Sequence, residues 1–402
     1  MRLGTSKRGR RAHDVAVYAP SGSLYYGEKR DYMGGAEVQA TKIAHALKAK
    51  GLRVAHVVYP VPEPRRVDAS SPTLVERSDW QGHRRLGQLA ETRAIWRGLE
   101  RADAGAYIVR GSGGHVIPAS AFCRARNRRF VFSSSSELDF DFARPDRNPR
   151  MLQVYKGSLR LAARLALQTE QQRELALRAL PRSDPVVIPS FAEPGPSSNG
   201  TGEYFLWADR LVEYKLPDSY LELAAALPEA RFRMVACHMS ETPPGMVERI
   251  EAAAERLPNL ELLPPRPRSE LLEEMQGAVA VVKTSRVEGM PNTFLEAWAR
   301  GVPALSLNVD PDGCIAAQGL GVAANGSWER FVAGARELWD GRRDRSPLSQ
   351  RTRTYVQTVH SPDVVGARWQ ALVEELARAR PRRWPLRPSR ARTAAGASPS
   401  RR

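Results

Sequence analysis

The sequence predicts two α/β domains, each a doubly wound parallel sheet covered by helices, which face one another across a cleft. Short apolar runs alternate with stretches of helical periodicity along most of the 402 residues. The segment 195–202 (GPSSNGTG) interrupts this alternation near the middle of the chain and has the composition of a linker. The length is also sufficient for two domains with sizeable cores.

The first domain is expected over residues 13–185, with a first strand at 13–19 and a first helix after Gly34 and Gly35. A glycine pair at a strand-to-helix turn lets the backbone approach a ligand closely, although many α/β proteins place glycine there only for tight packing. Further strands are predicted at 52–59, 106–109 and 129–133, and one long helix at 151–180.

The second domain is expected over residues 186–360, entered by a short strand at 186–189. A helix at 364–377 lies in a last folded segment, 361–380. Strands are predicted at 204–208, 232–236, 260–263, 279–282 and 302–307, and helices at 244–256, 269–276, 291–300 and 328–338.

The net charge of +17 is concentrated at the two ends of the chain. Residues 1–12 and 381–402 carry 12 Lys and Arg between them and no acid, and we expect a disordered leader and a disordered tail. Such tails can attract an anionic membrane surface or nucleic acid, or stay solvated without a partner. Nucleic acid is the partner least expected, and the charge alone does not select a function.

The sequence predicts a cytoplasmic protein, either free or peripheral on the inner face of the membrane. No apolar run approaches eighteen residues, and the run at 15–19 is too short for a signal peptide. The three cysteines, Cys123, Cys237 and Cys314, are far apart and match no zinc or redox spacing, which indicates reduced thiols.

Two glutamates in the stretch 279–307 carry the most informative chemistry. Glu288 lies in the loop after a predicted strand, and Glu296 lies eight residues later inside the helix that Pro291 could begin. The first amides of such a helix are a site for phosphate, and a carboxylate beside them could accept hydrogen bonds from a diol such as ribose. The alternative is that Glu288 caps the helix and Glu296 lies on its solvated side.

A second pair of charged residues follows the strand predicted at 204–208. Arg210 and Lys215 lie five residues apart on one loop, where both could converge on a diphosphate and offset the charge of a leaving nucleotide. Taken alone, the pair is equally consistent with two solvated side chains.

Both segments resemble those of one enzyme family. The string EGMPNTFLEAWARGVPALSL resembles the E-x7-E segment of retaining glycosyltransferases of family 4, which have the GT-B fold. The string ADRLVEYKLPDSYLELAAAL resembles the R-x4-K segment of that family, and GGAE at 34–37 resembles its glycine-rich turn. The resemblance covers most of residues 13–377, and it implies a GT-B architecture whose last helix crosses back to the first domain.

The resemblance also implies roles for individual residues. Arg210 and Lys215 would stabilise the departing diphosphate, Glu288 would position the transferred sugar, and these three are the expected catalytic residues. The reaction would proceed by front-face substitution, in which the leaving phosphate assists the acceptor. The expected donor-binding residues are Glu296 at the ribose, the amide loop Gly289, Met290, Pro291, Asn292 and Thr293, and the glycines Gly34 and Gly35.

Four further residues are weaker candidates for the site. His115 follows a strand and could be a base or a phosphate ligand, or a structural histidine. Ser135 and Glu137 lie in SSSSELDFD, where many family members instead have a histidine near the donor sugar, and Arg266 lies in a loop that approaches the base in relatives. The alternating acids of SSSSELDFD could suggest a metal site, but enzymes of this fold generally need no metal, so we expect no metal and no cofactor.

The expected function is transfer of a hexose from a nucleotide-sugar, most plausibly a UDP-sugar, to a saccharide or lipid-linked acceptor in glycan or polysaccharide biosynthesis. Three alternatives remain at this point, and one of them is a nucleic-acid binder that uses the basic ends. A sugar-nucleotide epimerase of the same fold would act without an acceptor. A non-catalytic membrane-surface or scaffold protein would account for the basic ends and the missing histidine.

Overall fold

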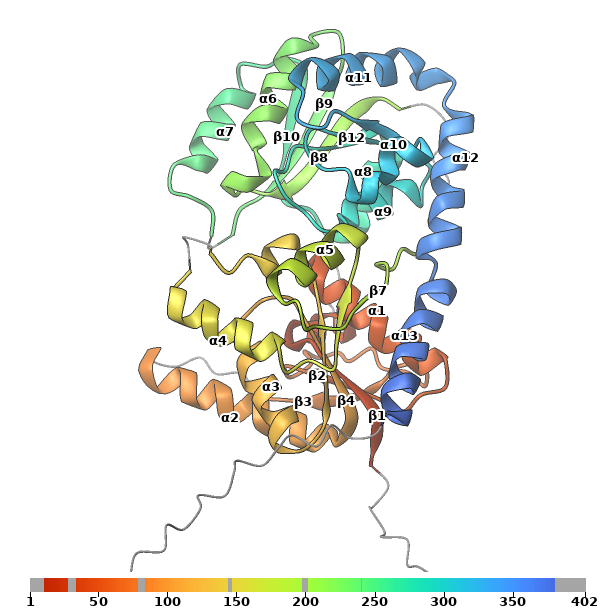
Figure 1. The fold of residues 1–402 in the computed structure, drawn as a ribbon. Coiled ribbons are helices and arrows are strands. Elements are labelled where there is room, and N and C mark those ends of the chain that lie inside the picture. Colours follow the sequence, from red (N-terminus) through yellow and green to blue (C-terminus); the bar gives the residue numbers. More distant parts are fainter. Residues whose placement is uncertain are drawn as a thin grey trace, which may run out of the picture.

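The computed structural model describes residues 11–27, 34–78, 84–143, 147–196, 202–239 and 241–379. The predictions for the basic tail at 381–402, for nearly all of the leader and for most of the linker lie outside these residues. Figure 1 shows two domains stacked on one another, with the last helices running along one side from the second domain to the first.

The first domain contains a seven-stranded parallel sheet in the order β3-β2-β1-β4-β5-β6-β7. Its strands are β1 (His13–Tyr18), β2 (Val54–Val58), β3 (Thr73–Glu76), β4 (Ala104–Arg110), β5 (Arg129–Ser133), β6 (Arg164–Leu167) and β7 (Pro185–Val187). Its helices are α1 (Gly35–Ala49), α2 (Arg84–Ala102), α3 (Val116–Ala125), α4 (Pro149–Leu159) and α5 (Glu170–Ala179), with short 3-10 helices at Pro20–Tyr26 and Glu137–Phe140.

The second domain contains a six-stranded parallel sheet in the order β10-β9-β8-β11-β12-β13. Its strands are β8 (Tyr204–Arg210), β9 (Phe232–Cys237), β10 (Leu260–Leu263), β11 (Ala278–Lys283), β12 (Ala304–Ser306) and β13 (Gly321–Ala323). Its helices are α6 (Pro217–Ala226), α7 (Met246–Ala254), α8 (Arg268–Gly277), α9 (Asn292–Trp298), α10 (Cys314–Gln318), α11 (Trp328–Asp340) and α12 (Ser346–Tyr355), followed by α13 (Pro362–Arg378).

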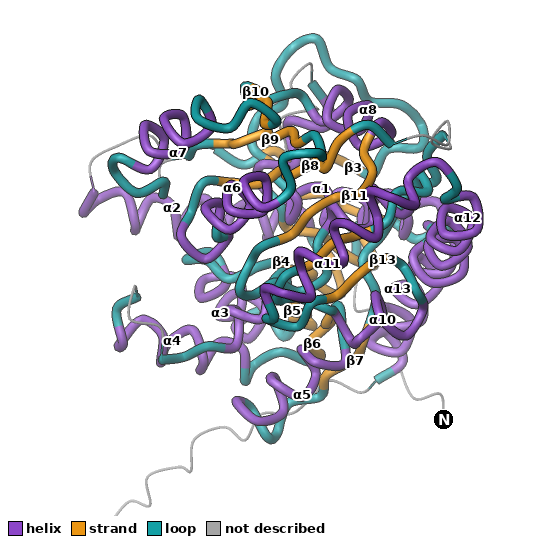
Figure 2. Tube along the Cα trace, turned by 90° about the horizontal axis from the view of Figure 1, so that it is seen from above, coloured by secondary structure: helices purple, strands orange, loops and turns teal. Residues whose placement is uncertain are grey.

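Both sheets are buried on their two faces, as parallel sheets require. In β1, Val15 and Val17 belong to one apolar core while Ala16 and Tyr18 belong to another, because successive side chains point to opposite faces of a strand. Viewed from above, the strands of the structure lie inside a surround of helices (Figure 2). The predicted α/β class with two doubly wound domains is confirmed.

The last helix, α13, belongs to the core of the first domain. Val365 and Trp369 pack in the same apolar cluster as Val15 of β1, and Lys50 of α1 forms an ion pair with Asp363 at 3.0 Å. The two domains are therefore joined twice, once by the segment after β7 and once by this returning helix.

Two predicted elements differ from the structure, and some strands were not predicted. The long helix at 151–180 is wrong, because β6 divides it into α4 and α5. The strand predicted to enter the second domain at 186–189 is instead β7, the edge of the first sheet, where Val187 pairs with Leu167. The sequence analysis also missed β3, which pairs with β2 at the other edge.

None of the described helices is both long and apolar enough to cross a lipid bilayer.

Candidate active site

The candidate site lies where the carboxyl ends of the two sheets approach one another, the position at which open parallel sheets bind ligands. From the second sheet, β8 ends at Arg210 and β11 ends at Lys283, followed by the loop that carries Glu288. The first domain contacts the second domain here through helix α5. The backbone amides of Glu170 and Gln171, at the start of α5, each donate to Asp312 of the second domain at 2.9 Å.

Lys215 is the centre of a buried chain of charges. Its Nζ forms one ion pair with Glu288 and another with Asp209 Oδ2 at 2.9 Å. Asp209 Oδ2 also accepts from Lys283 Nζ at 2.7 Å. Both lysines are almost inaccessible, at 6% exposure for Lys215 and 3% for Lys283. This chain of charges joins the ends of β8 and β11 and fixes Glu288 beside a cation.

The charge of each group in this chain depends on its neighbours. Burial alone would lower the pKa of Lys215, but the carboxylates of Asp209 and Glu288 overcome that effect and raise it. Burial alone would raise the pKa of Asp209, but Lys283 and Lys215 overcome that effect and lower it. Lys215 is thus held as a cation at the carboxyl edge of the sheet.

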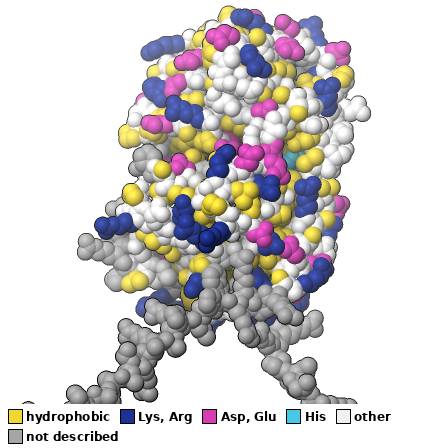
Figure 3. All heavy atoms as spheres, in the orientation of Figure 1, with side chains coloured by type: hydrophobic (Ala, Val, Ile, Leu, Met, Phe, Trp, Pro, Cys, Tyr) yellow, Lys and Arg dark blue, Asp and Glu magenta, His cyan; other side chains and the backbone are white. Residues whose placement is uncertain are grey.

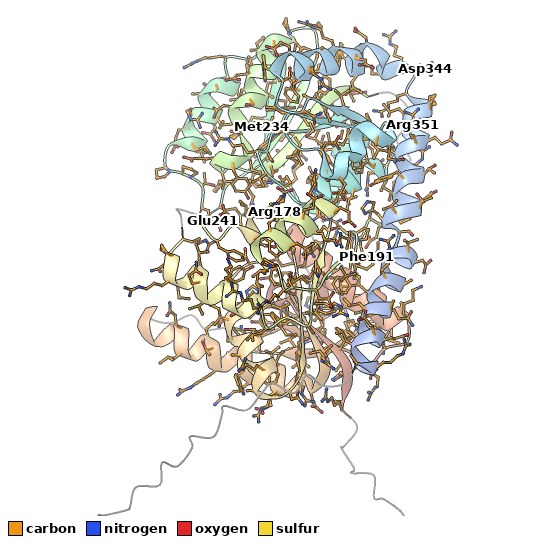
Figure 4. The ribbon with its side chains drawn as sticks, viewed as in Figure 1. Arg178, Phe191, Met234, Glu241, Asp344 and Arg351 are labelled. Atoms are coloured by element: carbon orange, nitrogen blue, oxygen red, sulfur yellow. The ribbon has the colours of Figure 1, made fainter. Side chains whose placement is uncertain are left out.

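Arg210, predicted to converge with Lys215, takes a different direction. Its Nη2 donates to Tyr214 Oη at 2.7 Å, and its Nη1 lies 3.8 Å from Glu241 Oε2. Its side chain is 45% exposed, whereas that of Lys215 is 7% exposed. Figure 4 places Glu241 at the boundary between the domains, so Arg210 lies at the edge of the cleft and outside the buried charge chain.

Glu296 lies on α9, as expected, and is bound by an arginine that the sequence analysis did not select. Arg268, the first residue of α8, donates from both Nε and Nη2 to Glu296 Oε1, with the Nε bond at 3.0 Å. Burial lowers the pKa of Lys42 on α1, and the charges of Glu296 and Arg268 also act on this side chain. The carboxylate predicted for ribose therefore lies at a charged contact between both domains.

The loop between Glu288 and α9 is covered by side chains of the first domain. A methyl group at Gly289 would clash with the side-chain amides of Gln168 and Gln172, which would have to move to accommodate it. Asn292 Oδ1 accepts from Gln39 Nε2 of α1 at 2.9 Å.

The other residues of this loop divide between packing and polar roles. Met290 is buried in an apolar cluster of the second domain, and its side chain is therefore a packing group. Pro291 is the residue before the first turn of α9. Thr293 Oγ1 is buried without a hydrogen-bond partner, as is Ser285 Oγ at the end of β11. Buried hydroxyls of this kind are rare in folded proteins, and a ligand can supply the missing partner.

The glycine turn of the first domain meets the same loop. Gly34 precedes α1 and Gly35 begins it. A Cβ atom at Gly35 would overlap the side-chain nitrogen of Asn292. The structure therefore brings together Gly34–Gly35 and Gly289–Thr293, which lie more than 250 positions apart in the sequence.

The segment that departs from the family pattern is organised by Asp139. This buried carboxylate accepts from the amide of Ser135 at 2.7 Å and from Ser134 Oγ at 3.0 Å, which closes the turn after β5. Glu137 points instead toward the cleft, and burial, followed by the charges of Asp312 and Glu288, raises its pKa. Among the described residues, no three His, Cys, Asp or Glu side chains form a cluster that could hold a metal ion.

The two remaining weak candidates are in different surroundings. His115 stacks on Tyr18 with ring centroids 5.6 Å apart, and burial lowers its pKa, so the ring is neutral. Arg266 forms ion pairs along α8, with Glu270 at 3.2 Å and Glu274 at 3.8 Å. The structure thus places His115 in the first domain, close to the cleft, and commits Arg266 to the helix beside it.

A cavity of about 390 Å³ opens between the domains next to Glu288. Its walls include Glu137 and Arg178 from the first domain and Arg286 and Asp310 from the second. Figure 3 shows acidic and basic side chains next to one another on the surface around the middle of the molecule. In Figure 4 the label of Arg178 shows where the cavity lies between the domains.

The sequence analysis missed several polar residues of this region because each is isolated in the sequence. Asp209 and Lys283 end their strands without any motif of their own. Gln39, Gln168 and Arg268 become recognisable only when the two domains are brought together. A signal existed for Asp209 alone, since it directly precedes Arg210 in the R-x4-K segment.

Part of the chain matches a known protein family. Residues 180–355, which contain the Lys215, Glu288 and Glu296 positions, match the family described as glycosyl transferases group 1. No curated protein matches the chain.

Several solved structures share the fold. Sucrose-phosphate synthase from Thermosynechococcus elongatus has a TM-score of 0.71 at 13% identity, covering 90% of this chain and 98% of its own. The Anabaena protein HepE in complex with UDP-glucose has a TM-score of 0.68 at 14% identity, covering 90% and 99%. An E. coli trehalose-6-phosphate protein bound with UDP-2-fluoro glucose has a TM-score of 0.68 at 14% identity, covering 92% and 100%. The chain therefore has the GT-B fold, and its residues 180–355 match the glycosyl transferases group 1 family.

Proposed function

We propose that this protein is a retaining glycosyltransferase of the family 4 type, which moves a hexose from a UDP-sugar to a saccharide or lipid-linked acceptor in glycan or polysaccharide biosynthesis. The observation that carries the proposal is the position of Lys215. Its ammonium group is held between Asp209 and Glu288 at the carboxyl edge of the second sheet, inside the region that matches glycosyl transferases group 1.

In this proposal Lys215 stabilises the diphosphate as it departs. A preorganised cation in a site with little water stabilises developing negative charge without a reorganisation cost at the moment of reaction. Glu288 positions the transferred sugar, and its contact with Lys215 places that sugar next to the phosphate it leaves. Arg210, at the edge of the cleft, is free to turn from Tyr214 toward the outer phosphate when the donor binds.

Glu296 holds the ribose of the donor. Both hydrogen bonds that Arg268 donates to Glu296 go to Oε1, and the ribose diol is assigned to Oε2. Arg268 would then orient the carboxylate, since two donors on one oxygen restrict its rotation. Thr293 Oγ1 and Ser285 Oγ, buried without partners, are available to the phosphates or the sugar. The proposal assigns the charge compensation of the diphosphate to side chains and requires no metal and no cofactor.

Two of the similar structures support the choice of donor, since HepE was solved with UDP-glucose and the E. coli trehalose-6-phosphate protein with UDP-2-fluoro glucose. The direct test is incubation of the full-length protein with UDP-sugars and a set of mono- and disaccharide acceptors, followed by NMR of the product. An α-linked product from an α-linked donor supports retention. A β-linked product contradicts the retaining mechanism, and an epimerised donor formed without acceptor contradicts the transferase assignment.

A further inference from the structure

A second, smaller cavity of about 160 Å³ lies entirely within the first domain, at the carboxyl ends of β1 and β4. It is much smaller than the roughly 300–1,000 Å³ of a site that takes a whole ligand. It can therefore receive only one end of a substrate. Its polar lining consists of Tyr18, Ser21, Glu37, Tyr59, Arg110 and His115.

Arg110 is the unusual member of this lining because its charge lacks a partner of opposite sign. Its Nη1 donates to Ser133 Oγ at 2.8 Å. Its Nη2 donates to the side-chain oxygen of Gln168 at 3.1 Å when the Gln168 amide is turned so that its oxygen faces donors and its nitrogen faces acceptors. Its Nε is buried without any partner. Among the described residues, no carboxylate comes within ion-pair distance of this guanidinium.

The two carboxylates whose charges act on Arg110, those of Asp139 and Glu37, form no ion pair with it. Asp139 accepts bonds from Ser134, Ser135 and the amide of Ser112. The carboxylate of Glu37 lies back over Gly34, at the start of its own helix. Burial accordingly lowers the pKa of Arg110 to about 10, which means that its surroundings disfavour the charge. Arg110 is partly exposed at the cavity, but its Nε is buried. A cation in such surroundings without a counter-ion lowers stability, so its presence needs another reason.

Gln168 connects Arg110 to the donor loop. Its side chain bonds to Arg110 on one side and fills the space above Gly289 on the other. Arg110 is therefore separated from the Glu288 loop by a single side chain. A group bound at Arg110 would lie within reach of the position at which sugar transfer is proposed.

We propose that Arg110 binds an anionic group, a phosphate or a carboxylate, carried by the sugar substrate that enters the first-domain cavity. This inference rests on the proposed glycosyltransferase function. Arginine suits the task because its planar donors match both anions, and its Nε–H is the donor left without a partner. The bound anion supplies the counter-charge that the protein itself does not provide.

The test is isothermal titration calorimetry on the full-length protein in the presence of saturating UDP, which fills the proposed diphosphate site. Glucose 6-phosphate, glucuronate and inorganic phosphate are the probes, and glucose is the uncharged control. Wild type is compared with Arg110→Gln, with Arg110→Lys, and with Arg182→Gln, which removes an exposed arginine of the same domain that lines neither cavity.

We expect one charged sugar to bind more tightly than glucose, and Arg110→Gln to weaken it roughly 10- to 100-fold, the factor expected for loss of a charge-assisted hydrogen bond. Arg110→Lys should recover part of the affinity, and Arg182→Gln should leave it unchanged. Preference for glucose 6-phosphate identifies the anion as a phosphate, and preference for glucuronate identifies it as a carboxylate. The unfolding temperature of Arg110→Gln should be unchanged or higher, because an uncompensated and only partly exposed charge has been removed.

Three results would overturn the inference. In one, neither charged sugar binds better than glucose; in another, Arg110→Gln binds the charged sugar as wild type does. The third is a marked drop in unfolding temperature in Arg110→Gln, which would show a structural arginine. If UDP itself fails to bind wild type, the proposed function falls first and the inference falls with it, so the two failures are distinguishable.

Discussion

Replacing Lys215 with methionine tests the buried charge chain, and Lys283→Met is its matched control. Both lysines are buried and both bond to Asp209 Oδ2, at 2.9 Å and 2.7 Å, but only Lys215 also contacts Glu288. Removing one partner of a buried ion pair typically costs about 3–5 kcal/mol, because the remaining charge is left uncompensated. In a domain of this size that is a drop of roughly 6–20 °C in unfolding temperature, and we expect it in both variants.

The two variants should differ in catalysis. Loss of a preorganised group that stabilises developing charge typically lowers kcat by about 10²–10³-fold, and we expect this loss in Lys215→Met alone. The assay is release of UDP from the UDP-sugar found active in the product screen, measured below the unfolding temperature of the less stable variant. Full turnover in Lys215→Met, or an equal loss in Lys283→Met, would refute the role given to Lys215.

Two further substitutions test the closed cleft and the buried histidine. Gly35→Ala should reduce turnover several-fold and cost about 1 kcal/mol, because its methyl group must displace the Asn292 amide and break its hydrogen bond to Gln39. Gly157→Ala, with no atom near its new methyl group, should do neither. Chemical unfolding and activity assays measure both effects, and equal results for the two substitutions would contradict the contact. Burial lowers the pKa of His56 from 6.5 to about 3. Between these pH values the histidine is protonated in the unfolded chain and neutral in the folded chain. Stability should therefore be complete above pH 6.5 and fall by up to about 1.4 kcal/mol per pH unit between pH 6.5 and 3. Urea unfolding across this range should show a shallower fall for His56→Gln but not for the exposed His238→Gln, and an unchanged slope in His56→Gln would contradict the assignment.

The elements next to the site could be predicted because local patterns determine them. The apolar residues of β11 and the proline before α9 are recognisable in the sequence. So is Gly301 after α9, where the backbone has a φ of +81° that favours glycine. This is why the positions of Glu288 and Glu296 relative to the strand and helix were predictable. By contrast β6 was missed, since Leu165, Ala166 and Leu167 are good helix formers and only pairing with β5 and β7 makes them a strand.

The contacts of individual side chains were less predictable, because they depend on residues that are distant in the sequence. Sequence spacing suggested that Arg210 and Lys215 act together, yet Tyr214 and Glu241 draw Arg210 outward while Asp209 holds Lys215 inside. The pairing of Arg268 with Glu296 depends on how α8 packs beside α9, which periodicity does not specify. The roles of these residues in catalysis stay predictions until they are measured.

The central claim is that the second domain binds a nucleotide-sugar through Glu296, and thermal unfolding tests it most directly. Wild type and Glu296→Ala are compared with UDP, GDP, ADP and their glucose conjugates, with Glu222→Ala on α6 as a control for loss of a carboxylate elsewhere. A ligand at 100 times its Kd that binds only the folded protein adds about 2.7 kcal/mol. We predict a clear rise in unfolding temperature with UDP and UDP-glucose for wild type and Glu222→Ala, and a smaller rise for Glu296→Ala. No rise with any nucleotide, or an equal rise in Glu296→Ala, would contradict the account.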